Sequence, residues 1–335
     1  YNYLARPVYF LSVALTVAVY FIGATTNGAA RWIPVAGFQF QPSEALKVAT
    51  ILLLARRLSS CQSKIDRIRI VPSLNPFRWG RPAQRKIWRE GTRPILLPVV
   101  LSCAVIFPAH TSSAMLVFLT SLVMMLIGRV RVSELVRLVG LACAALLLAG
   151  LLNLGRSETA GGRVSTWIDL WTSSQTEKPI DRLTDTERSM IAIHNGGLLG
   201  EGAGQSAMRV EMIHPESDYA YAFFVEEYGI ILAGILLMLY LWIFFRAREI
   251  FVRCGTAFPG LLVLGLALMI TCQALLHVMV TVNLMPETGQ TLPLISRGGS
   301  SVLFTVIALG MILSVSRQND EQSHDTPRSE SIYEK

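Results

Sequence analysis

The sequence predicts an all-α protein, a polytopic bundle of transmembrane helices. Of its 335 residues, 52% are hydrophobic and only 16% are charged, whereas charged residues make up about 25% of an ordinary soluble domain. The chain also contains several apolar stretches of about 20 residues, the length that an α-helix needs to cross a bilayer. The same composition argues against a disordered chain, which would have few apolar residues and many charges.

Eight apolar segments are expected to span the membrane. Their approximate ranges are 7–24, 43–57, 94–108, 112–128, 134–154, 220–245, 257–282 and 298–316. The second and third are short for a full span. The link between the first two, residues 27–34, is rich in turn-forming residues and holds Trp32 as an expected interfacial anchor.

The distribution of Lys and Arg predicts the orientation of these spans. The loop 56–93 carries eleven basic residues and two acids, and the short links around Arg129 and Arg246 are also basic. If the spans alternate, all three links lie on one side, which the positive-inside rule identifies as the cytoplasm. The long loop 155–219 carries six basic and ten acidic residues, so we expect it to be extracytoplasmic. The net charge of +7 is then a topology signal and no indication of nucleic-acid binding.

We interpret residues 1–317 as one transmembrane domain and residues 318–335 as a polar cytoplasmic tail. With this alternation, both termini of the chain are cytoplasmic. The sequence begins at Tyr1, and we expect it to be part of a longer protein that has further amino-terminal spans. It has no convincing internal repeat, which weakens the case for a transporter built from inverted repeats. Its five cysteines form no CxxC pair, so neither a zinc site nor a disulfide framework is predicted.

Glu44 and Lys47 are charged residues at the start of the second apolar segment. A spacing of three residues puts them on one face of a helix, where they can pair. Either charge alone would cost roughly 3 kcal/mol at the centre of a membrane helix on insertion scales. Two interpretations stay open: a structural ion pair, and one edge of a polar substrate cavity.

Asp218 and Glu226 lie at the end of the long loop and at the start of the sixth apolar segment. Acidic residues at this depth usually face the bundle interior or a wet cavity. Eight residues separate the two, which places them near the same helical face and predicts an outward-facing acidic site. The alternative for Asp218 is a helix cap. The glycine-rich stretch 193–206 before them favours an interfacial turn over a phosphate loop, because it lacks a Walker lysine.

The last link, residues 283–301, contains two prolines and three glycines, which interrupt the helix at membrane depth. Such backbone is tolerated where it is buried in protein or lines a polar cavity. Ser296, Arg297 and Ser300 could meet an anionic head group there. His277, in the preceding span, is expected to make a helix–helix hydrogen bond rather than to act as a ligand.

These blocks, in this order, resemble the SEDS proteins (shape, elongation, division and sporulation), the FtsW/RodA family. The matching blocks are Asn27-Gly28-Ala29 with Arg31-Trp32, Gln41-Pro42-Ser43-Glu44 with Lys47, Ile191-Ala192-Ile193 with Gly196-Gly197, Gly200-x-Gly202-x-Gly204, Ser217-Asp218-Tyr219, Glu226-Glu227-x-Gly229, and Pro286-x-Thr288-Gly289 through Ser301. The resemblance covers roughly residues 1–317 and is greater to the division branch, FtsW, than to the elongation branch. The chain departs from the family pattern at 108–114, which lacks the common acidic-Leu-Gly-Thr form, and at His277, where asparagine is common.

The resemblance implies a peptidoglycan glycosyltransferase with ten spans, of which this chain has eight. Such enzymes polymerise lipid II, an undecaprenyl-pyrophosphate disaccharide-peptide, at the outer face of the bacterial inner membrane for septal wall synthesis. They act with a class B penicillin-binding protein and with other division proteins. The family's proposed catalytic aspartate falls on Asp218, and a divalent cation at the pyrophosphate stays open, with no metal ligand assigned. The candidate substrate-binding residues are Arg31, Glu44, Lys47, Arg209, Glu226, Ser296, Arg297 and Ser300.

Two other functions stay open. A transporter of the lipid-linked precursor would use the same charged cavity, but that cavity would have to open to both sides of the membrane in turn. A non-catalytic membrane scaffold of the division machinery would need no acid at Asp218. The polar groups gather on the outer side, which favours the enzyme.

Overall fold

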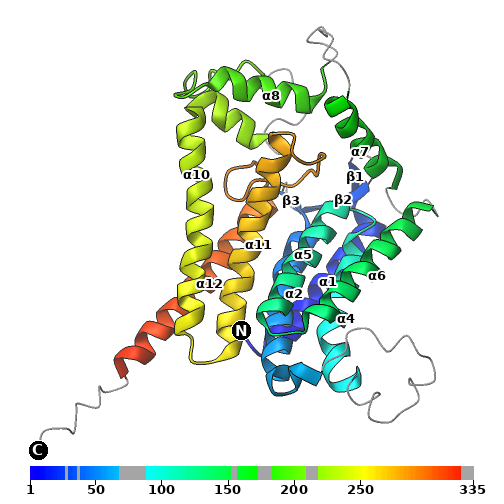
Figure 1. Ribbon diagram of the computed structural model, residues 1–335, viewed down its shortest axis with the longest axis vertical. Coiled ribbons are helices and arrows are strands. Elements are labelled where there is room, and N and C mark those ends of the chain that lie inside the picture. The colour runs from blue at the N-terminus through cyan, green and yellow to red at the C-terminus, as the bar shows by residue number, and fades with distance from the viewer. Residues whose placement is uncertain are drawn as a thin grey trace, which may run out of the picture.

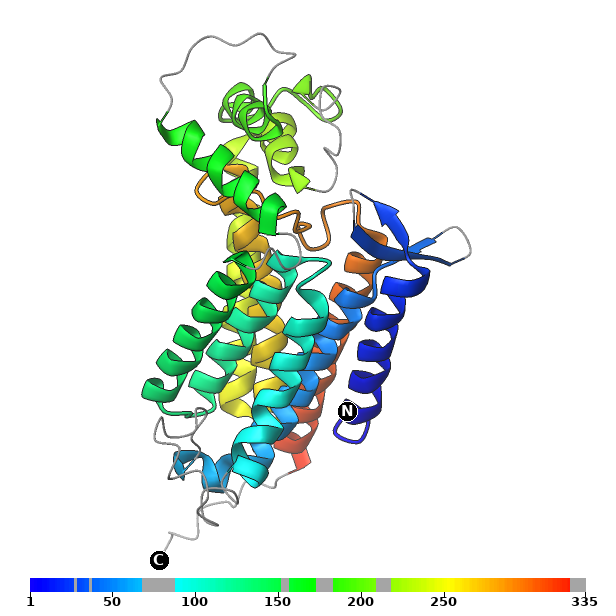
Figure 2. The same cartoon turned by 90° about the vertical axis from the view of Figure 1, so that its right-hand side faces the viewer.

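Eight helices in the described part of the computed structural model run side by side as a bundle (Figures 1 and 2). The structure describes residues 1–26, 29–35, 38–67, 88–151, 157–172, 183–208 and 218–325. The bundle helices are α1 (Ala5–Ile22), α2 (Pro42–Cys61), α4 (Arg93–Ile106), α5 (Thr111–Ile127), α6 (Val132–Leu151), α10 (Ala220–Arg253), α11 (Ala257–Thr281) and α12 (Gly299–Asp325). Two short helical turns, Gln62–Arg67 and Trp88–Thr92, follow α2 and precede α4.

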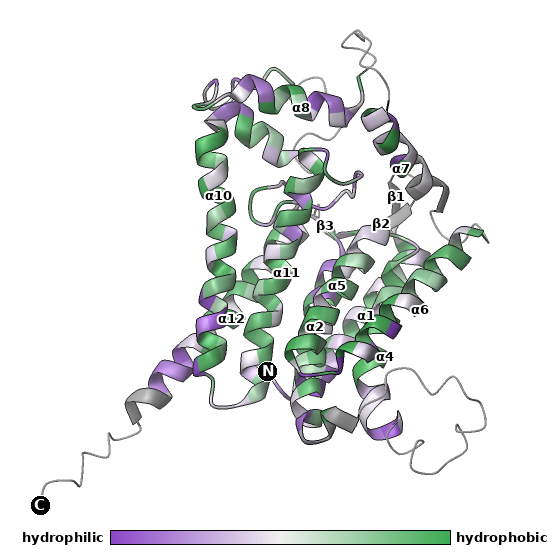
Figure 3. Ribbon diagram, viewed as in Figure 1, coloured by the Kyte–Doolittle hydropathy of each residue, from purple (hydrophilic) through white to green (hydrophobic). Residues whose placement is uncertain are grey.

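Each predicted span corresponds to one of these helices, so the prediction of a polytopic helical membrane protein is confirmed. Five of the helices, α1, α6, α10, α11 and α12, are long and apolar enough to cross a membrane. α5 is a shorter apolar helix, and α2 and α4 pack beside it in the same bundle. Figure 3 shows the hydrophobic residues concentrated along the bundle helices.

α2 and α11 form the interior of the bundle. α2 is buried along most of its length, and α11 packs against α2, α5, α10 and α12. In the apolar stretch of α11, 78% of the residues are buried, whereas the share is 17% for α6 and for α10. The outer helices therefore present apolar side chains to the lipid, whose tails are as apolar as those side chains.

A cap lies over one end of the bundle (Figure 2). The name cap covers α7 (Ser157–Thr172), α8 (Asp185–Gly196), residues 197–208 and residues 218–228. α8 begins with a capping box, in which the Thr184 side chain accepts from the Glu187 N–H and the Glu187 side chain accepts from the Thr184 N–H. Tyr1 and the end of α12 lie at the end of the bundle opposite the cap.

α10 is broken at Gly229, which has φ 79° and ψ 167°, so its two halves point in different directions (Figure 1). A break frees backbone groups that need partners in a membrane protein. The glycine-rich residues after α8 provide them: Glu201 N–H donates to Glu226 O (2.9 Å), Gly202 N–H to Glu227 O (3.0 Å), and Ile230 N–H to Gly197 O (3.0 Å). The approach is so close that a Cβ on Gly229 would lie 2.3 Å from Leu198 O.

Three short antiparallel strands join α1 to α2, where the sequence predicted only a turn-rich link. They are β1 (Ala24–Thr26), β2 (Ala29–Val35) and β3 (Phe38–Phe40), paired in the order β1-β2-β3. Trp32 is opposite Ala24, and Ile33 is opposite Phe40. Aromatic and β-branched residues favour strands, but runs this short are hard to recognise beside long apolar segments.

The first part of the predicted polar tail is helical. Residues 318–325 continue α12, and Arg317 Nε lies 2.8 Å from Glu321 Oε1. Opposite charges four residues apart stabilise a helix, and α12 extends beyond the apolar stretch. The rest of the predicted tail, and residues 68–87 of the predicted basic loop, lie outside the described residues.

Candidate active site

Asp218 lies at the cap end of the bundle, just before the first half of α10. Its Oδ2 atom is 3.8 Å from the point where a side chain on Gly289 would begin, so the carboxylate faces the 283–298 loop between α11 and α12. The N-cap of α10 is Tyr219, which has non-helical φ −127° and ψ 24°. The structure thus does not use Asp218 as the N-cap of this helix.

Two further carboxylates, those of Glu287 and Asp185, lie near Asp218. Burial raises the pKa of Glu287, Arg163 opposes that effect, and the negative charges of Asp218 and Asp185 raise the pKa further. Arg163 Nε lies 3.7 Å from Glu287 Oε2, so the acids have a cation beside them. Within the described ranges, no group of three or more His, Cys, Asp or Glu side chains is arranged to hold a metal ion.

The cap is attached to the 283–298 loop by side-chain hydrogen bonds. From α7, Trp167 Nε1 donates to Asn283 O over 3.0 Å. From α8, Ser189 Oγ lies 3.1 Å from Thr281 O, at the end of α11, and shares its hydrogen with Thr186 O of its own helix at 2.8 Å. The α8 residue Thr186 also bonds to the hydroxyl of Tyr219 over 3.0 Å. Both cap helices therefore hold Asp218 and the loop in one assembly.

Four consecutive backbone carbonyls of the loop, those of residues 288–291, each accept a hydrogen bond from a side chain of another element. The donors, in order along the loop, are Ser112 (2.5 Å), His110 (3.2 Å), His277 (2.7 Å) and Gln273 (2.9 Å). His110 Nδ1 accepts from the Ser113 N–H, so its Nε2 carries the hydrogen that bonds Gly289 O. Irregular backbone in a membrane protein needs such partners wherever water cannot reach it.

Glu44 and Lys47 form the predicted ion pair. Lys47 Nζ lies 2.8 Å from Glu44 Oε1, and the Lys47 side chain is 1% exposed. The ammonium also donates to Gln273 Oε1 over 2.9 Å. Gln273 donates in turn to Thr291 O, so the buried pair on α2 is connected through α11 to the loop. Whether either residue binds a substrate stays a prediction.

Glu226 and Asp218 have different surroundings, although the sequence predicted one acidic site for both. Glu226 is fully buried in the cap, and its Oε2 accepts a hydrogen bond from Ser206 Oγ. Its Oε1 has no hydrogen-bond partner among the described residues. Counting helical faces from Asp218 fails because the non-helical Tyr219 lies between the two acids.

The other candidate binding residues lie in several places. Ser296 is buried and its Oγ accepts from the Leu292 N–H over 2.7 Å, so it stabilises the turn before α12. Ser300 is fully buried, whereas Arg297 is exposed at the cap end. Arg31 lies on β2, where the structure describes its backbone only, and Arg209 lies outside the described residues. Their roles in binding stay predictions.

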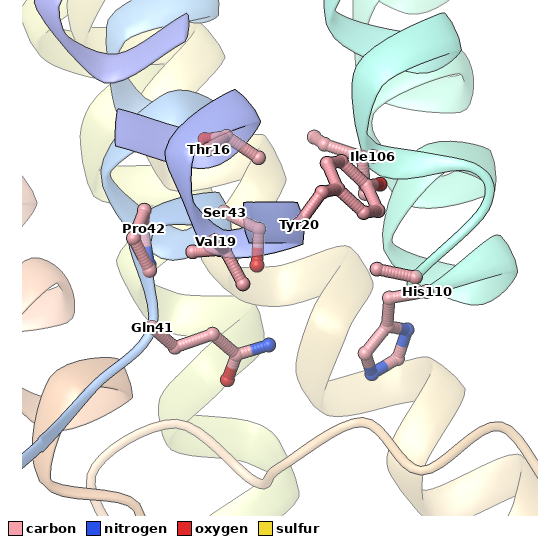
Figure 4. A pocket seen from close by; sticks show the side chains of 9 residues that line it. Thr16, Val19, Tyr20, Gln41, Pro42, Ser43, Ile106 and His110 are labelled. Carbon is pink, nitrogen blue, oxygen red and sulfur yellow. The ribbon is translucent and has the colours of Figure 1, made fainter. Parts of the chain in front are cut away.

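A small pocket lies at the cap-side ends of α1, α2 and α4 (Figure 4). Its apolar wall includes Val19, Tyr20 and Ile106, while Gln41 and His110 point toward one another at its polar end (Figure 4). His110 is also the residue that holds Gly289 O. His110 is thus shared between the lining of this pocket and the contacts of the loop that faces Asp218.

Three of the loop's donors, Ser112, His110 and Gln273, were not identified from the sequence. Gln273 carried a signal, because an amide in an otherwise apolar span has to find a partner. His110 lies just before α5, where a side chain can cap the helix as this one does. Neither position tells which carbonyl the side chain will meet, since that depends on how α5 and α11 pack.

A sequence profile named for FtsW, RodA and SpoVE, with the description "Cell cycle protein", matches residues 1–321. The chain belongs to this family. Curated FtsW/RodA/SpoVE relatives include one named "Probable peptidoglycan glycosyltransferase FtsW" from Aliivibrio salmonicida, 25% identical, with 97% of this chain and 76% of the relative covered. A protein of the same name from Coxiella burnetii is 29% identical over 89% of this chain and 74% of the relative.

A third relative is the stage V sporulation protein E of Bacillus subtilis, 28% identical over 88% of this chain and 74% of the relative. Solved structures of FtsW/RodA/SpoVE type share the fold. A structure described as a peptidoglycan synthase complex that coordinates polymerization and crosslinking matches with a TM-score of 0.68 and 24% identity, over 95% of this chain and 82% of the other. Thermus thermophilus RodA matches with a TM-score of 0.60 and 24% identity, over 95% and 79%.

Proposed function

We propose that this chain is a peptidoglycan glycosyltransferase that polymerises lipid II into glycan strands for septal wall synthesis. The names of its relatives support the activity and the division role. The observation that carries the proposal is the position of Asp218, whose carboxylate faces the anchored 283–298 loop at one end of a membrane-spanning bundle. A lipid-linked sugar presents its reacting bond at that depth, because its chain stays in the bilayer.

In the proposed reaction, a sugar hydroxyl of the acceptor attacks the anomeric carbon of the donor. The new glycosidic bond forms as the bond to the lipid pyrophosphate breaks, and the pyrophosphate leaves with the electron pair. Asp218 takes the proton of the attacking hydroxyl as general base, a role worth typically about 10²–10⁴-fold in rate. Asp218 lies close enough to Glu287 for their charges to interact, and Arg163 pairs with Glu287 there.

The departing pyrophosphate needs positive charge nearby. Arg297 is exposed at the cap end and is our first candidate, with Arg31 and Arg209 as further candidates. Lys47 is 1% exposed and paired with Glu44, so we do not assign it a direct contact with the pyrophosphate. A divalent cation could add to them. Because the described carboxylates do not form a metal-binding group, we expect such a cation to be held chiefly by pyrophosphate oxygens, and the steps above do not require it.

We place the protein in the bacterial inner membrane with the cap on the extracytoplasmic side. Basic residues in the links at the opposite end, such as Arg129 and Arg246, support this orientation. Tyr1 and the end of α12 lie at that basic end, which makes both termini cytoplasmic. Lipid II then reaches Asp218 from the outer leaflet.

The proposed partners are a class B penicillin-binding protein and other division proteins. The similarity to a structure described as a peptidoglycan synthase complex supports a transpeptidase partner. Outer helices with exposed apolar side chains, including Trp242 and Phe245 of α10, offer surfaces on which a single transmembrane helix could pack.

The test is polymerisation by the purified protein in liposomes with lipid II, with and without the class B penicillin-binding protein of the same genome. Asparagine keeps the size of Asp218 but is no base, so Asp218→Asn should lose at least about 100-fold in rate. Asp169→Asn, on the exposed face of α7, is the matched control and should leave the rate unchanged. If lipid II crosses the bilayer and no glycan forms, the result would indicate the transporter. If lipid II neither crosses the bilayer nor is polymerised, the result would indicate the scaffold.

A further inference from the structure

We propose that His277 is a positioning residue for the transfer reaction, because it joins the helix that follows Asp218 to the loop that Asp218 faces. This inference rests on the proposed function. His277 lies on α11 and is 1% exposed, so its imidazole cannot contact a substrate directly. It can act only through the groups that it holds.

Both ring nitrogens of His277 have backbone partners. Nε2 accepts a hydrogen bond from the N–H of Tyr221 over 3.3 Å. Nδ1 lies 2.7 Å from the carbonyl oxygen of Gln290. A backbone N–H can only donate and a carbonyl can only accept, so the ring is the neutral tautomer with its hydrogen on Nδ1.

The two partners are the immediate neighbours of the candidate site. Tyr221 is three residues after Asp218, in the first turn of α10, where backbone N–H groups have no partner within the helix. Gln290 follows Gly289, the residue against which the Asp218 carboxylate lies. One rigid ring therefore sets the distance between the two segments that carry Asp218 and Gly289.

The other donors to the loop have different second contacts. Gln273 also accepts from Lys47, which ties the loop to α2. His110 also accepts from the Ser113 N–H, which ties the loop to the start of α5. Those side chains fix the loop to the bundle, whereas His277 fixes it to the helix next to Asp218. Loss of His277 should shift Asp218 relative to the loop while the loop stays attached to the bundle.

Three variants separate the two hydrogen bonds. His277→Leu keeps much of the volume and removes both bonds. His277→Asn keeps a donor near the position of Nδ1, and His277→Gln keeps an acceptor near the position of Nε2. Thr271→Val is the matched control, because Thr271 is also a buried polar residue of α11 and donates instead to Tyr240 O, within the second half of α10.

The first measurement is steady-state polymerisation per folded protein. A displacement of about 1 Å from the reactive geometry can cost about 100-fold in rate, so His277→Leu should lower kcat by at least about tenfold with KM changed less than about twofold. The kcat values of His277→Asn and His277→Gln should lie between those of His277→Leu and the wild type. Equal kcat for His277→Leu and the wild type would overturn the inference, because a merely structural residue would change only the amount of folded protein.

The second measurement does not depend on activity. Amide hydrogen exchange should speed up in residues 218–224 and 288–291 of His277→Leu and stay unchanged in Thr271→Val. If hydrogen exchange in both segments is the same in His277→Leu as in the wild type, the link is contradicted, whatever polymerisation rate is measured. If the wild type makes no glycan but exchange responds as expected, the proposed function fails and the link stands, so the two failures are distinguishable.

Discussion

Lys47 Nζ donates to Gln273 Oε1 over 2.9 Å, and this contact joins α2 to α11 in the interior of the bundle. The same ammonium is paired with Glu44. Because Gln273 also donates to Thr291 O, the buried ion pair supports the loop that faces Asp218. A change in the pair is therefore expected to affect both stability and the geometry of the site.

Replacing Lys47 tests the ion pair. Lys47→Ala leaves the Glu44 charge without its partner in a buried site, which should destabilise the protein by about 3–5 kcal/mol. The double variant with Glu44→Ala should lose less than the sum of the two single variants in thermal unfolding. The exposed pair Arg246 and Glu249 is the control, and its loss should change stability by less than about 1 kcal/mol. Strict additivity for Glu44 and Lys47 would contradict a functional pairing.

Replacing Gly229 tests the break in α10. Gly229→Ala puts a Cβ 2.3 Å from Leu198 O, and the backbone at φ 79° and ψ 167° is a conformation that is almost confined to glycine and itself costs about 1–3 kcal/mol for another residue. We expect a large fall in melting temperature or no folded protein. Gly234→Ala, in the second half of the same helix, meets no atom within 4 Å and should stabilise by about 0.5–1 kcal/mol. Similar melting temperatures for both variants would show that the break is not needed.

Glu287 should make stability depend on pH. Its folded-state pKa is raised above the ordinary value of 4.5, chiefly by burial, so the folded state binds more protons than the unfolded state just above pH 4.5. Stability from this group is therefore greatest at low pH and falls as the pH rises through its folded-state pKa. The stability of Glu287→Gln should not show this fall with rising pH. Melting curves recorded from pH 4.5 upward for the variant and the wild type would reveal the difference. Glu249→Gln, at the exposed end of α10, should follow the wild type.

Removing the Ser206 hydroxyl tests the buried carboxylate of the cap. Ser206 Oγ donates to Glu226 Oε2, and Glu226 is fully buried. Ser206→Ala should destabilise by about 1–3 kcal/mol, the typical effect of leaving a buried acceptor without its donor. Ser165→Ala, on the exposed face of α7, should change the melting temperature little. Equal effects of the two variants would mean that the Ser206 hydrogen bond does not stabilise the cap.

The sequence predicted the spans well because their signal is length, and length in a bilayer is set by its thickness. The Glu44–Lys47 pair was also predictable, since both residues lie on one helix and their spacing determines their distance. The irregular 283–298 loop was predictable from its prolines and glycines. These features depend on local sequence alone.

The partners of that loop could not be predicted, because they depend on how α11, which precedes the loop, packs against α5, which lies far from the loop in the sequence. His277 and Gln273 were recognisable as polar residues in an apolar span, but the carbonyl that each one meets depends on helix packing. Residue spacing placed Glu226 with Asp218 on the assumption of a continuous helix, whereas Tyr219, between them, has non-helical φ and ψ.

The interruption of α10 at Gly229 also has a mechanical consequence. A continuous helix is a stiff rod, and a membrane span changes its tilt when the thickness of the bilayer changes. In this protein the helix is interrupted at Gly229, and residues 197–202 hydrogen-bond to the backbone on both sides of the break, at Glu226, Glu227 and Ile230. The direction of the half next to Asp218 is therefore fixed by the cap backbone at the break and not by an unbroken helix axis.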